Sequence, residues 1–334
     1  MSALRGVNLG GWLVLERWMT PSVFEGTSAR DEYTFMQTDG ARGKLRQHQK
    51  SFITEADFRW LHENGIEAVR IPVGYWILDG DDPFVSSIGK LDWAFAMAQK
   101  YELEVLISLH GAQGSQNGYD HSGRIGDARW YTDAAFRHDT VRTLVALSKR
   151  YRDHPRFWGI ELLNEPLPGV LQVKLRTFYR DAYRVLKEIL LPTTRIVFHD
   201  AFRPRMMVAA LIDDDSRPVM MDIHWYHFGF WARKWMSKGQ YYYFVRWHGR
   251  LIRRLQRWQG VIIGEWSGAL AWEMLNRYPE DARHQVELDH VRTQLEVYRY
   301  ADAWFYWSYK TEFGGTWSLR SLIEDDGLSL KQQG

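Results

Sequence analysis

The chain has 334 residues, with 43 basic against 41 acidic side chains and no cysteine. This balance of charge argues against a nucleic-acid-binding protein driven by a global positive field. The lack of cysteine excludes disulfide bonds and thiolate metal sites. Aromatic residues make up 15% of the chain and include 17 tryptophans, more than a core needs, which favours exposed rings that stack on sugars over an aromatic core alone.

Neither a secretory signal nor a membrane span is predicted. The first residues, MSALRGVNLGG, lack the apolar stretch of a signal peptide. No apolar run approaches the roughly 18–20 residues that a membrane-spanning helix needs. We therefore expect either a protein that works inside the cell or a secreted domain whose signal has been trimmed, and the oligomeric state stays open.

Eight short apolar or β-branched runs recur along the chain, with helical patterns between them. The runs begin at Leu4, Glu67, Glu104, Phe157, Thr194, Pro218, Gly260 and Ala303. One helical pattern spans residues 54–65, where Thr54 can cap the first turn and Gly65 can end the helix, and another spans residues 91–101. Strands that alternate with helices indicate a parallel sheet, and eight such units predict an α/β fold, a single (β/α)8 TIM barrel over residues 1–334.

The downstream end of nearly every predicted strand carries a polar or aromatic side chain. In chain order these residues are Asn8, Arg70, His110, Asn164 with Glu165, His199 with Asp200, His224 with Tyr226, Glu265 and Trp307. TIM-barrel enzymes build their active sites where the carboxyl ends of the strands meet. Because a purely structural sheet does not need this pattern, the sequence predicts a catalytic site at that end of the barrel.

Glu165 and Glu265 carry the strongest prediction. Glu165 lies in the segment FWGIELLNEP, and Glu265 lies in GVIIGEWSG. The apolar runs before these residues are typical of strands that are buried on both faces. Two carboxylates on different strands of one barrel are what glycosidic-bond cleavage requires, one as proton donor and the other as nucleophile or base.

The sequence also resembles glycoside hydrolase family 5, and within it the exo-β-1,3-glucanases best known from fungi. The matching blocks, in the same order, are RGVNLGGWLVLERW, VRIPVGYW, SLHGAQGSQNGYDHSG, GIELLNEP, HDAF, IHWYHF, GEWSGAL and FYWSYKTE. The resemblance implies a (β/α)8 barrel and a retaining mechanism. It also implies that Glu165 is the acid/base and that Glu265 is the nucleophile.

A retaining mechanism makes specific demands on these two residues. Their carboxyl groups should lie about 5–5.5 Å apart. Glu265 would attack the anomeric carbon to form a covalent glycosyl-enzyme, while Glu165 would protonate the leaving oxygen and later deprotonate a water molecule. We therefore expect Glu165 to be protonated and Glu265 to be ionised in the resting enzyme.

Four residues at strand ends are predicted to support this chemistry. Arg70 is placed to hold Glu265 charged and oriented, a role that rests largely on the resemblance. Asn164 should donate a hydrogen bond to the sugar 2-hydroxyl, which strengthens in the transition state. His110 and His224 should bind sugar hydroxyls or orient their neighbours.

Five further residues are expected to bind the substrate or position the nucleophile. Tyr226 can hydrogen-bond the nucleophile, and Trp307 is placed to form the stacking floor under the terminal sugar. Glu16 resembles the family residue that grips hydroxyls of the terminal glucose, and Asp120, next to Tyr119, is a second candidate for this grip. A site closed by Glu16 would be a pocket, and the enzyme would then act from the chain end.

A metal site is not predicted. Three histidines at strand ends could bind zinc, but one of them, His199, can equally be a structural residue with its polar atoms satisfied. The chain has no HExxH or similar spacing, and a pair of carboxylates needs neither a metal ion nor another cofactor for glycoside hydrolysis.

The chain departs from the fungal pattern at three positions near the predicted site. Tyr119 and His121 stand where the fungal block QNGFDNSG has Phe and Asn, and Trp18 stands where a Tyr is usual. These differences leave the proposed chemistry intact, but they weaken a prediction of the glucan linkage.

The segment from Tyr226 to Trp247, YHFGFWARKWMSKGQYYYFVRW, is unusually rich in aromatic residues. It follows the sixth predicted strand, so residues 227–247 are expected to form an insert beside the site. The insert could stack acceptor sugars or an apolar aglycone, or it could be a packed subdomain or a dimer contact.

We therefore predict a retaining enzyme that releases glucose from β-1,3-glucans, with the glucan or glucoside as its only predicted partner. One alternative is a β-1,6- or β-1,4-glucanase, or a hydrolase of glucosides with an apolar aglycone. An alternative of another class is a barrel that binds glycans without cutting them, but the presence of both Glu165 and Glu265 argues against it.

Overall fold

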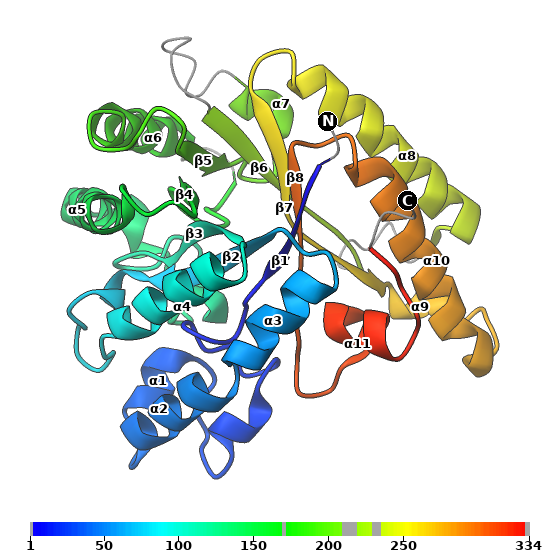
Figure 1. The fold of residues 1–334 in the computed structure, drawn as a ribbon, viewed down its shortest axis with the longest axis horizontal. Helices are drawn as coiled ribbons and strands as arrows, with labels where there is room; N and C mark the ends of the chain where they lie inside the picture. The colour runs from blue at the N-terminus through cyan, green and yellow to red at the C-terminus, as the bar shows by residue number, and fades with distance from the viewer. Residues whose placement is uncertain (1–2, 169–171, 209–218, 229–234, 331–334) are drawn as a thin grey trace.

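The computed structural model describes residues 3–168, 172–208, 219–228 and 235–330, in which parallel strands close into a barrel in chain order (Figure 1). The strands are β1 (Leu4–Asn8), β2 (Ala68–Gly74), β3 (Glu104–Gly111), β4 (Phe157–Glu161), β5 (Arg195–His199), β6 (Val219–His227), β7 (Gly260–Leu270) and β8 (Ala303–Tyr306). Strand β8 pairs with β1 and thereby completes the closure. The predicted (β/α)8 barrel is confirmed.

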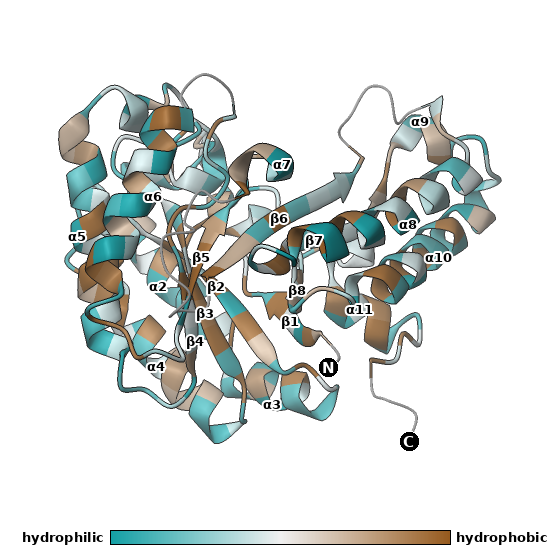
Figure 2. Cartoon of the chain, turned by 90° about the horizontal axis from the view of Figure 1, so that it is seen from above, coloured by the Kyte–Doolittle hydropathy of each residue, from teal (hydrophilic) through white to brown (hydrophobic). Residues whose placement is uncertain are grey.

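Helices cover the outside of the barrel. They are α1 (Glu32–Met36), α2 (Ala41–Ser51), α3 (Glu55–Glu63), α4 (Ile88–Lys100), α5 (Ala134–Tyr151), α6 (Gln172–Leu186), α7 (Pro204–Met207), α8 (Lys238–Leu255), α9 (Trp272–Leu275), α10 (Glu280–Tyr298) and α11 (Leu319–Glu324). Figures 1 and 2 show α8 and α10 side by side on one flank of the barrel, with α5 and α6 on the other. In the described part of the chain, no helix is long and apolar enough to cross a membrane.

Both predicted helices form for the expected local reasons. Helix α3 begins directly after Thr54, whose backbone N–H donates a 2.7 Å hydrogen bond to Asp57 Oδ2 in a capping box. Gly65 follows the end of α3 with a φ of 78°, a left-handed conformation that glycine adopts without strain. The pattern over residues 91–101 lies in α4, which begins three residues earlier because Ile88 also packs against the core.

The aromatic segment that follows β6 does not form one continuous insert. Helix α8 begins at Lys238, capped by Ser237, so the second half of the segment 227–247 belongs to a regular helix of the barrel. Residues 229–234 lie outside the described residues. Of the residues of this segment that the structure describes, Phe228 lines the site described below.

The interior of the barrel is divided into an apolar layer and a polar layer above it. The apolar layer consists of Leu4, Ala68, Leu106, Trp158, Val197, Met220, Ile262, Ala303 and Phe305. Side chains in a strand alternate between its two faces, so residues two positions further along point into the barrel again. On β2 and β6 these residues are Arg70 and Asp222, which places charged groups directly beneath the carboxyl ends of the strands.

Candidate active site

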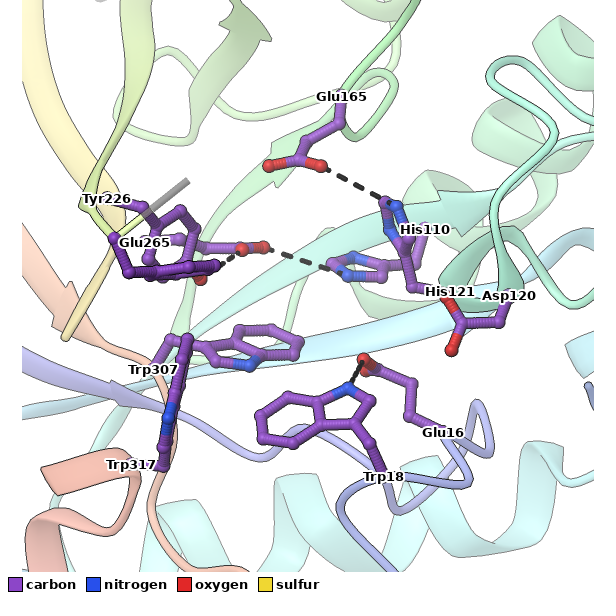
Figure 3. Close-up of a pocket in the computed structure, with 11 residues that line it drawn as sticks. Glu16, Trp18, His110, Asp120, His121, Glu165, Tyr226, Glu265, Trp307 and Trp317 are labelled. Atoms are coloured by element: carbon purple, nitrogen blue, oxygen red, sulfur yellow. Dashed lines mark hydrogen bonds and ion pairs between the residues drawn. The ribbon is translucent and has the colours of Figure 1, made fainter. Parts of the chain in front are cut away.

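A cavity of about 330 Å³ opens at the carboxyl ends of the strands (Figure 3). It is lined by Glu16, Trp18, His110, Asp120, His121, Glu165, Tyr226, Phe228, Glu265, Trp307 and Trp317. Figure 3 shows the side chains of Glu165 and Glu265 directed into the same space, above Trp307, Trp317 and Trp18. The proposed catalytic carboxyls of Glu165 and Glu265 therefore face tryptophan rings across the cavity.

Arg70 supports this cavity from below. We predicted Arg70 at the end of its strand, but it is the third residue of β2, because β2 continues to Gly74. Its side chain is fully buried. Nη1 donates 2.8 Å hydrogen bonds to Glu265 and Asn8, and Nη2 donates one of 2.8 Å to Asn164. Nε donates to Glu161 Oε2 at 2.8 Å, and Nη2 also lies 2.7 Å from that oxygen. The guanidinium therefore links β2 to side chains of β1, β4 and β7 and to the loop after β4.

Two buried carboxyls that the sequence analysis did not single out, Glu161 and Asp222, accompany Arg70. Burial raises the pKa of Glu161 to about 7, although Arg70 opposes the shift. Asp222 Oδ1 accepts a 2.6 Å hydrogen bond from the backbone N–H of Gly264. A Cβ at position 264 would lie 2.0 Å from this carboxylate, so only glycine fits there. The polar layer therefore depends on close packing as well as on charge.

Glu265 is held by groups from β2 and β6. Its Oε1 accepts the hydrogen bond from Arg70, and its Oε2 accepts a 2.8 Å hydrogen bond from the hydroxyl of Tyr226. Nε2 of His110 lies 3.7 Å from Oε1. Glu265 is a residue of β7, so the hydrogen bonds of the sheet fix its backbone. These contacts hold the oxygen atoms of Glu265 in one orientation toward the cavity.

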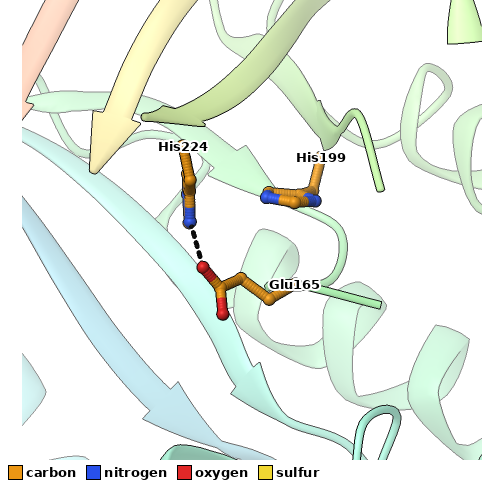
Figure 4. Close-up of side chains that lie close together, drawn as sticks. All are labelled: Glu165, His199 and His224. Atoms are coloured by element: carbon orange, nitrogen blue, oxygen red, sulfur yellow. Dashed lines mark hydrogen bonds and ion pairs between the residues drawn. The ribbon is translucent and has the colours of Figure 1, made fainter. Parts of the chain in front are cut away.

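Glu165 lies four residues beyond β4, on a loop, and its φ of 42° is unusual for a residue other than glycine. The amide of Asn117 donates a 3.1 Å hydrogen bond to the Glu165 carbonyl and secures this loop. The carboxyl Oε1 lies 2.7 Å from Nδ1 of His224, as Figure 4 shows. On its other side, Nε2 of His224 lies 3.3 Å from Asp222 Oδ2. The imidazole thus bridges two carboxyls.

The protonation of Glu165 and His224 differs from the one that we expected. Burial alone would raise the pKa of Glu165, but the hydrogen bond and the charge of His224 lower it. Burial would lower the pKa of His224, but Glu265 and Asp222 raise it well above its usual range. In the resting site the proton is therefore favoured on the imidazole, whereas we expected it on Glu165, because the bridging histidine was not foreseen.

The contacts of His224 set an upper limit on the spacing of the two carboxyls. Nδ1 of His224 lies 2.7 Å from Glu165 Oε1 and 3.5 Å from Glu265 Oε2. The two oxygens are thus at most 6.2 Å apart, the sum of these distances. Inverting enzymes separate their carboxyls by roughly 6.5–9.5 Å to seat a water molecule. The spacing here therefore favours retention of configuration.

Glu16 and Asp120 lie at the end of the cavity away from Glu165. Glu16 Oε2 accepts a 2.8 Å hydrogen bond from the indole of Trp18, while Oε1 is buried and has no hydrogen-bond partner among the described residues. Burial and the charge of Asp120 raise the pKa of Glu16 well above its usual range. An unpaired buried oxygen is costly, so this end of the cavity is suited to a polar group supplied by a ligand.

Two groups of side chains have the donor atoms of a metal site, within 4.8 Å of one another: Glu165, His199 and His224, and Glu161, Asp222 and His224. Nδ1 of His199 accepts a 3.0 Å hydrogen bond from the backbone N–H of Ala201, so the hydrogen of the neutral ring lies on Nε2. Both nitrogens of His224 face carboxyls. Neither histidine presents a free lone pair, which does not suit a metal ion.

The predicted site residues take three kinds of position. Glu16, His110, Asp120, Glu165, Tyr226, Glu265 and Trp307 line the cavity. Arg70, Asn164 and His224 do not line it and contact the lining residues from beneath. Tyr119 lies at the rim, where it is 55% exposed. The direct contact that we expected between Asn164 and the sugar stays a prediction.

Four lining residues were absent from the predicted site. Trp18 and His121 had been noted only as departures from the family pattern, and Phe228 only as part of the aromatic segment. Trp317 was missed altogether. It follows β8 in a turn begun by Gly314 and Gly315, and a tryptophan placed after two glycines beyond a barrel strand is the signal that could have identified it.

Comparison with known proteins agrees with this geometry. A family model described as cellulase (glycosyl hydrolase family 5) matches residues 29–312. The chain is 34% identical to the probable glucan 1,3-beta-glucosidase A of Emericella nidulans, over 96% of this chain and 88% of that protein. It is 32% identical to the glucan 1,3-beta-glucosidase of Kluyveromyces lactis, over 96% and 87% of the two chains.

Solved structures share the fold at lower identity. A rutinosidase from Aspergillus niger aligns with a TM-score of 0.82 at 18% identity, over 97% of each chain. An endoglucanase from Thermotoga maritima aligns with a TM-score of 0.61 at 18% identity, over 93% of this chain and 91% of that one. These two similarities concern the fold alone. From the family model and the sequence relatives, we conclude that the chain belongs to glycoside hydrolase family 5 and is a glycoside hydrolase.

Proposed function

We propose that this glycoside hydrolase removes terminal glucose from β-1,3-glucans with retention of configuration. The observation that carries the proposal is the position of His224 Nδ1 beside both Glu165 and Glu265. It limits the distance between two of their carboxyl oxygens to at most 6.2 Å, below the roughly 6.5–9.5 Å of inverting enzymes. The substrate is inferred from the printed names of the sequence relatives, which are glucan 1,3-beta-glucosidases.

In the first step, the ionised carboxylate of Glu265 attacks the anomeric carbon. A carbon–oxygen bond forms to Glu265, the glycosidic bond breaks, and the leaving oxygen takes a proton from Glu165. Arg70 and Tyr226 donate hydrogen bonds to the attacking carboxylate and keep it oriented. In the second step, Glu165 takes a proton from a water molecule, which displaces Glu265 and releases glucose.

Glu165 must receive its proton before the first step. The hydrogen bond between His224 Nδ1 and Glu165 Oε1 provides a direct route. A sugar that fills the cavity expels water, and desolvation favours the neutral forms of both groups over the ion pair. We infer that substrate binding moves the shared proton from the imidazole to Glu165, which converts this carboxylate into the acid.

The position of Glu16 supports action from the chain end. Its buried Oε1, together with Asp120, offers acceptors for hydroxyls of a terminal sugar on the side away from the acid/base. Trp307 lies parallel to His110, with ring centroids 5.6 Å apart, and presents an aromatic face to the cavity. Such a closed end would stop a longer chain from passing through.

A second candidate substrate, a β-glucoside with an apolar aglycone, is favoured by the rings at the cavity mouth. Phe228 is 42% exposed, and its ring centroid lies 5.1 Å from that of Trp317. Both rings line the cavity, so an apolar leaving group could contact them as well as a sugar could.

The test is a product analysis on laminarin, pustulan, cello-oligosaccharides and glucolipids at equal concentration. We expect laminarin to be cleaved fastest, with glucose as the only early product and the β-anomer formed first in an NMR time course. Early oligosaccharides would contradict chain-end action, and a first-formed α-anomer would contradict retention. Faster cleavage of the glucolipids would favour the second candidate. Binding to laminarin without any product would favour the glycan-binding barrel.

A further inference from the structure

His121 lies in the cavity beside the proposed acid/base, in the short 3-10 helix Asp120–Ser122 that follows β3. Its side chain is 15% exposed, and Nε2 lies 3.6 Å from Oε2 of Glu165. Figure 3 shows this contact as the dashed line that reaches Glu165 from the side of the cavity opposite Glu265. None of the steps described above requires this residue, so its position needs an explanation.

The orientation of the His121 ring is fixed by a chain of hydrogen bonds. Arg70 Nη2 donates to Oδ1 of Asn164 at 2.8 Å, which fixes the amide and turns its Nδ2 away from Arg70. This Nδ2 lies 3.3 Å from Nδ1 of His121. An amide nitrogen can only donate, so Nδ1 of His121 is the acceptor and its ring hydrogen lies on Nε2. The N–H bond that remains is the one next to Glu165.

Stacking fixes the plane of the same ring. The rings of Tyr119 and His121 are stacked, with centroids 5.6 Å apart and an interplanar angle of 14°. The His110 ring contacts His121 edge-on, with centroids 5.8 Å apart. With a hydrogen bond on one edge and rings on two sides, His121 has little freedom to turn its Nε2 away from the carboxyl.

We propose that His121 is a positioning residue that acts on the reaction through Glu165, by directing its Nε2–H at Oε2 of the acid/base opposite the contact from His224. Among the described residues, His224 and His121 are the only ones with a ring nitrogen within 4 Å of a carboxyl oxygen of Glu165. At 3.6 Å the contact is longer than a hydrogen bond, and contacts of this kind often tighten when substrate binds. This inference rests on the proposed function only in that Glu165 is the acid/base.

The contact has a consequence for the pH dependence of catalysis. A donor directed at a carboxylate stabilises its charged form, so His121 makes Glu165 lose its proton at a lower pH than it otherwise would. Other titratable or charged groups surround the pair: Glu16, Arg70, His110, Asp120, His199, Asp200, His224, Tyr226 and Glu265. These groups stay in place when His121 alone is replaced, so a change in the pH profile can be assigned to it.

The test compares His121→Asn and His121→Gln with the unaltered enzyme on two β-glucosides. One substrate is an alkyl β-glucoside, whose leaving oxygen needs a proton, and the other is 2,4-dinitrophenyl β-glucoside, whose leaving group does not. The readout is kcat/KM from about pH 5 to pH 9, because its alkaline limb reports loss of the proton that Glu165 and His224 share in the free enzyme. His138→Asn, an exposed histidine on α5, is the matched control.

We expect the alkaline limb of His121→Asn on the alkyl glucoside to move to higher pH. The ratio of variant to unaltered kcat/KM should then be at least about twofold larger at pH 8 than at pH 6. Both variants carry an amide N–H, but only Gln is long enough to place it near the position of the His121 Nε2–H, so His121→Gln should show a smaller change. Neither 2,4-dinitrophenyl β-glucoside nor His138→Asn should show one.

Equal ratios at both pH values in both variants would overturn the proposal. A change of the same size on both substrates would also overturn it, because the effect would then not pass through proton donation by Glu165. The test does not depend on the glucan, so failure of the laminarin assay would leave it valid. If Glu165→Gln cleaves the alkyl glucoside normally, the assignment of the acid/base fails instead.

Discussion

Glu265 and Glu165 face the same cavity, but the groups that hold them differ in whether they can lose a proton. Glu265 is held by Arg70 and by the hydroxyl of Tyr226. An arginine stays charged at every relevant pH. Burial alone would lower the pKa of Arg70, but the charges of Glu161, Glu265 and Asp222 raise it above its ordinary value. Glu165 instead faces two imidazoles, with His224 Nδ1 at 2.7 Å and His121 Nε2 at 3.6 Å, and an imidazole, unlike a guanidinium, can lose its proton.

The backbones of the two residues also differ in how firmly the sheet holds them. Glu265 lies inside β7 and is fixed by the sheet, whereas Glu165 lies on a loop with a positive φ. A nucleophile must keep one charge and one orientation, and an acid/base must lose and regain a proton in each cycle. The comparison shows how one active site can meet both needs. Glu265 lies beside an arginine that keeps its charge, and Glu165 lies beside a histidine that can exchange a proton with it.

The largest effect is expected when the charge of the nucleophile is removed. Glu265→Gln should lower kcat/KM for an aryl β-glucoside by about 10⁴-fold or more, because the amide cannot form the glycosyl-enzyme. Glu273→Gln, an exposed residue on α9, is the control and should leave the rate unchanged. Normal turnover by Glu265→Gln would reject this residue as the nucleophile.

Removal of the acid should instead give a loss that depends on the leaving group. Glu165→Gln should slow the cleavage of laminarin by about 10²–10⁴-fold, but should affect kcat/KM for 2,4-dinitrophenyl β-glucoside far less, because that leaving group needs no proton. Rates on the two substrates under identical conditions provide the measurement. A loss of equal size on both would show that Glu165 does not act as the acid, and the contrast with Glu265 would disappear.

The contribution of the charge of Arg70 can be tested through the stability of the fold. Arg70→Met leaves the buried carboxyls of Glu161, Asp222 and Glu265 without their cation, so the free energy of unfolding should fall by about 3–5 kcal/mol. Urea denaturation followed by tryptophan fluorescence measures this change. Adding Glu161→Gln to Arg70→Met should restore part of the loss, and a double variant no more stable than the single one would contradict the electrostatic explanation.

The smallest effect concerns the pH dependence of stability. Burial raises the pKa of Glu161 to about 7, above its ordinary value of 4.5. As the pH rises between these values, the unfolded chain releases this proton and the folded chain keeps it, so the free energy of unfolding falls. Below about pH 4.5 both states hold the proton and this contribution is constant.

Glu161→Gln removes this titration and should make the fall in stability between about pH 5 and pH 7 shallower. It should not abolish the fall, because burial also raises the pKa of Asp200 to about 7 and of Glu32 to about 8. Urea midpoints at several pH values check the slope, with Glu324→Gln on α11 as an exposed control. An unchanged slope would mean that Glu161 is ionised in the folded protein.

Strand order and the positions of Glu165 and Glu265 could be predicted because they depend on local patterns. Apolar runs ending in polar residues mark barrel strands, and the carboxyl ends of those strands converge whatever the details of packing. The sequence therefore indicated which side chains meet, and seven of the predicted residues line the cavity.

The supporting residues could not be predicted in the same way. Glu161 is apparent only from the strand register, which turns it into the barrel toward Arg70. The proton between His224 and Glu165 depends on Asp222, which lies behind the imidazole and is two positions from it in the chain. Trp317 reaches the cavity from a loop with no strand pattern. Such contacts are set by three-dimensional packing, which one-dimensional periodicity does not specify.

The assignment of Glu265 as nucleophile and Glu165 as acid/base is tested most directly by trapping the covalent intermediate. The enzyme is incubated with 2,4-dinitrophenyl 2-deoxy-2-fluoro-β-glucoside. Its fluorine slows both steps, but its activated leaving group speeds the first, so the glycosyl-enzyme accumulates. Digestion and mass spectrometry then locate the sugar. We predict one fluoroglucosyl group per chain, bound to Glu265 in the segment GVIIGEWSG. A label on Glu165 or on any other residue would contradict the assignment of the nucleophile, and turnover without a label would contradict the covalent mechanism.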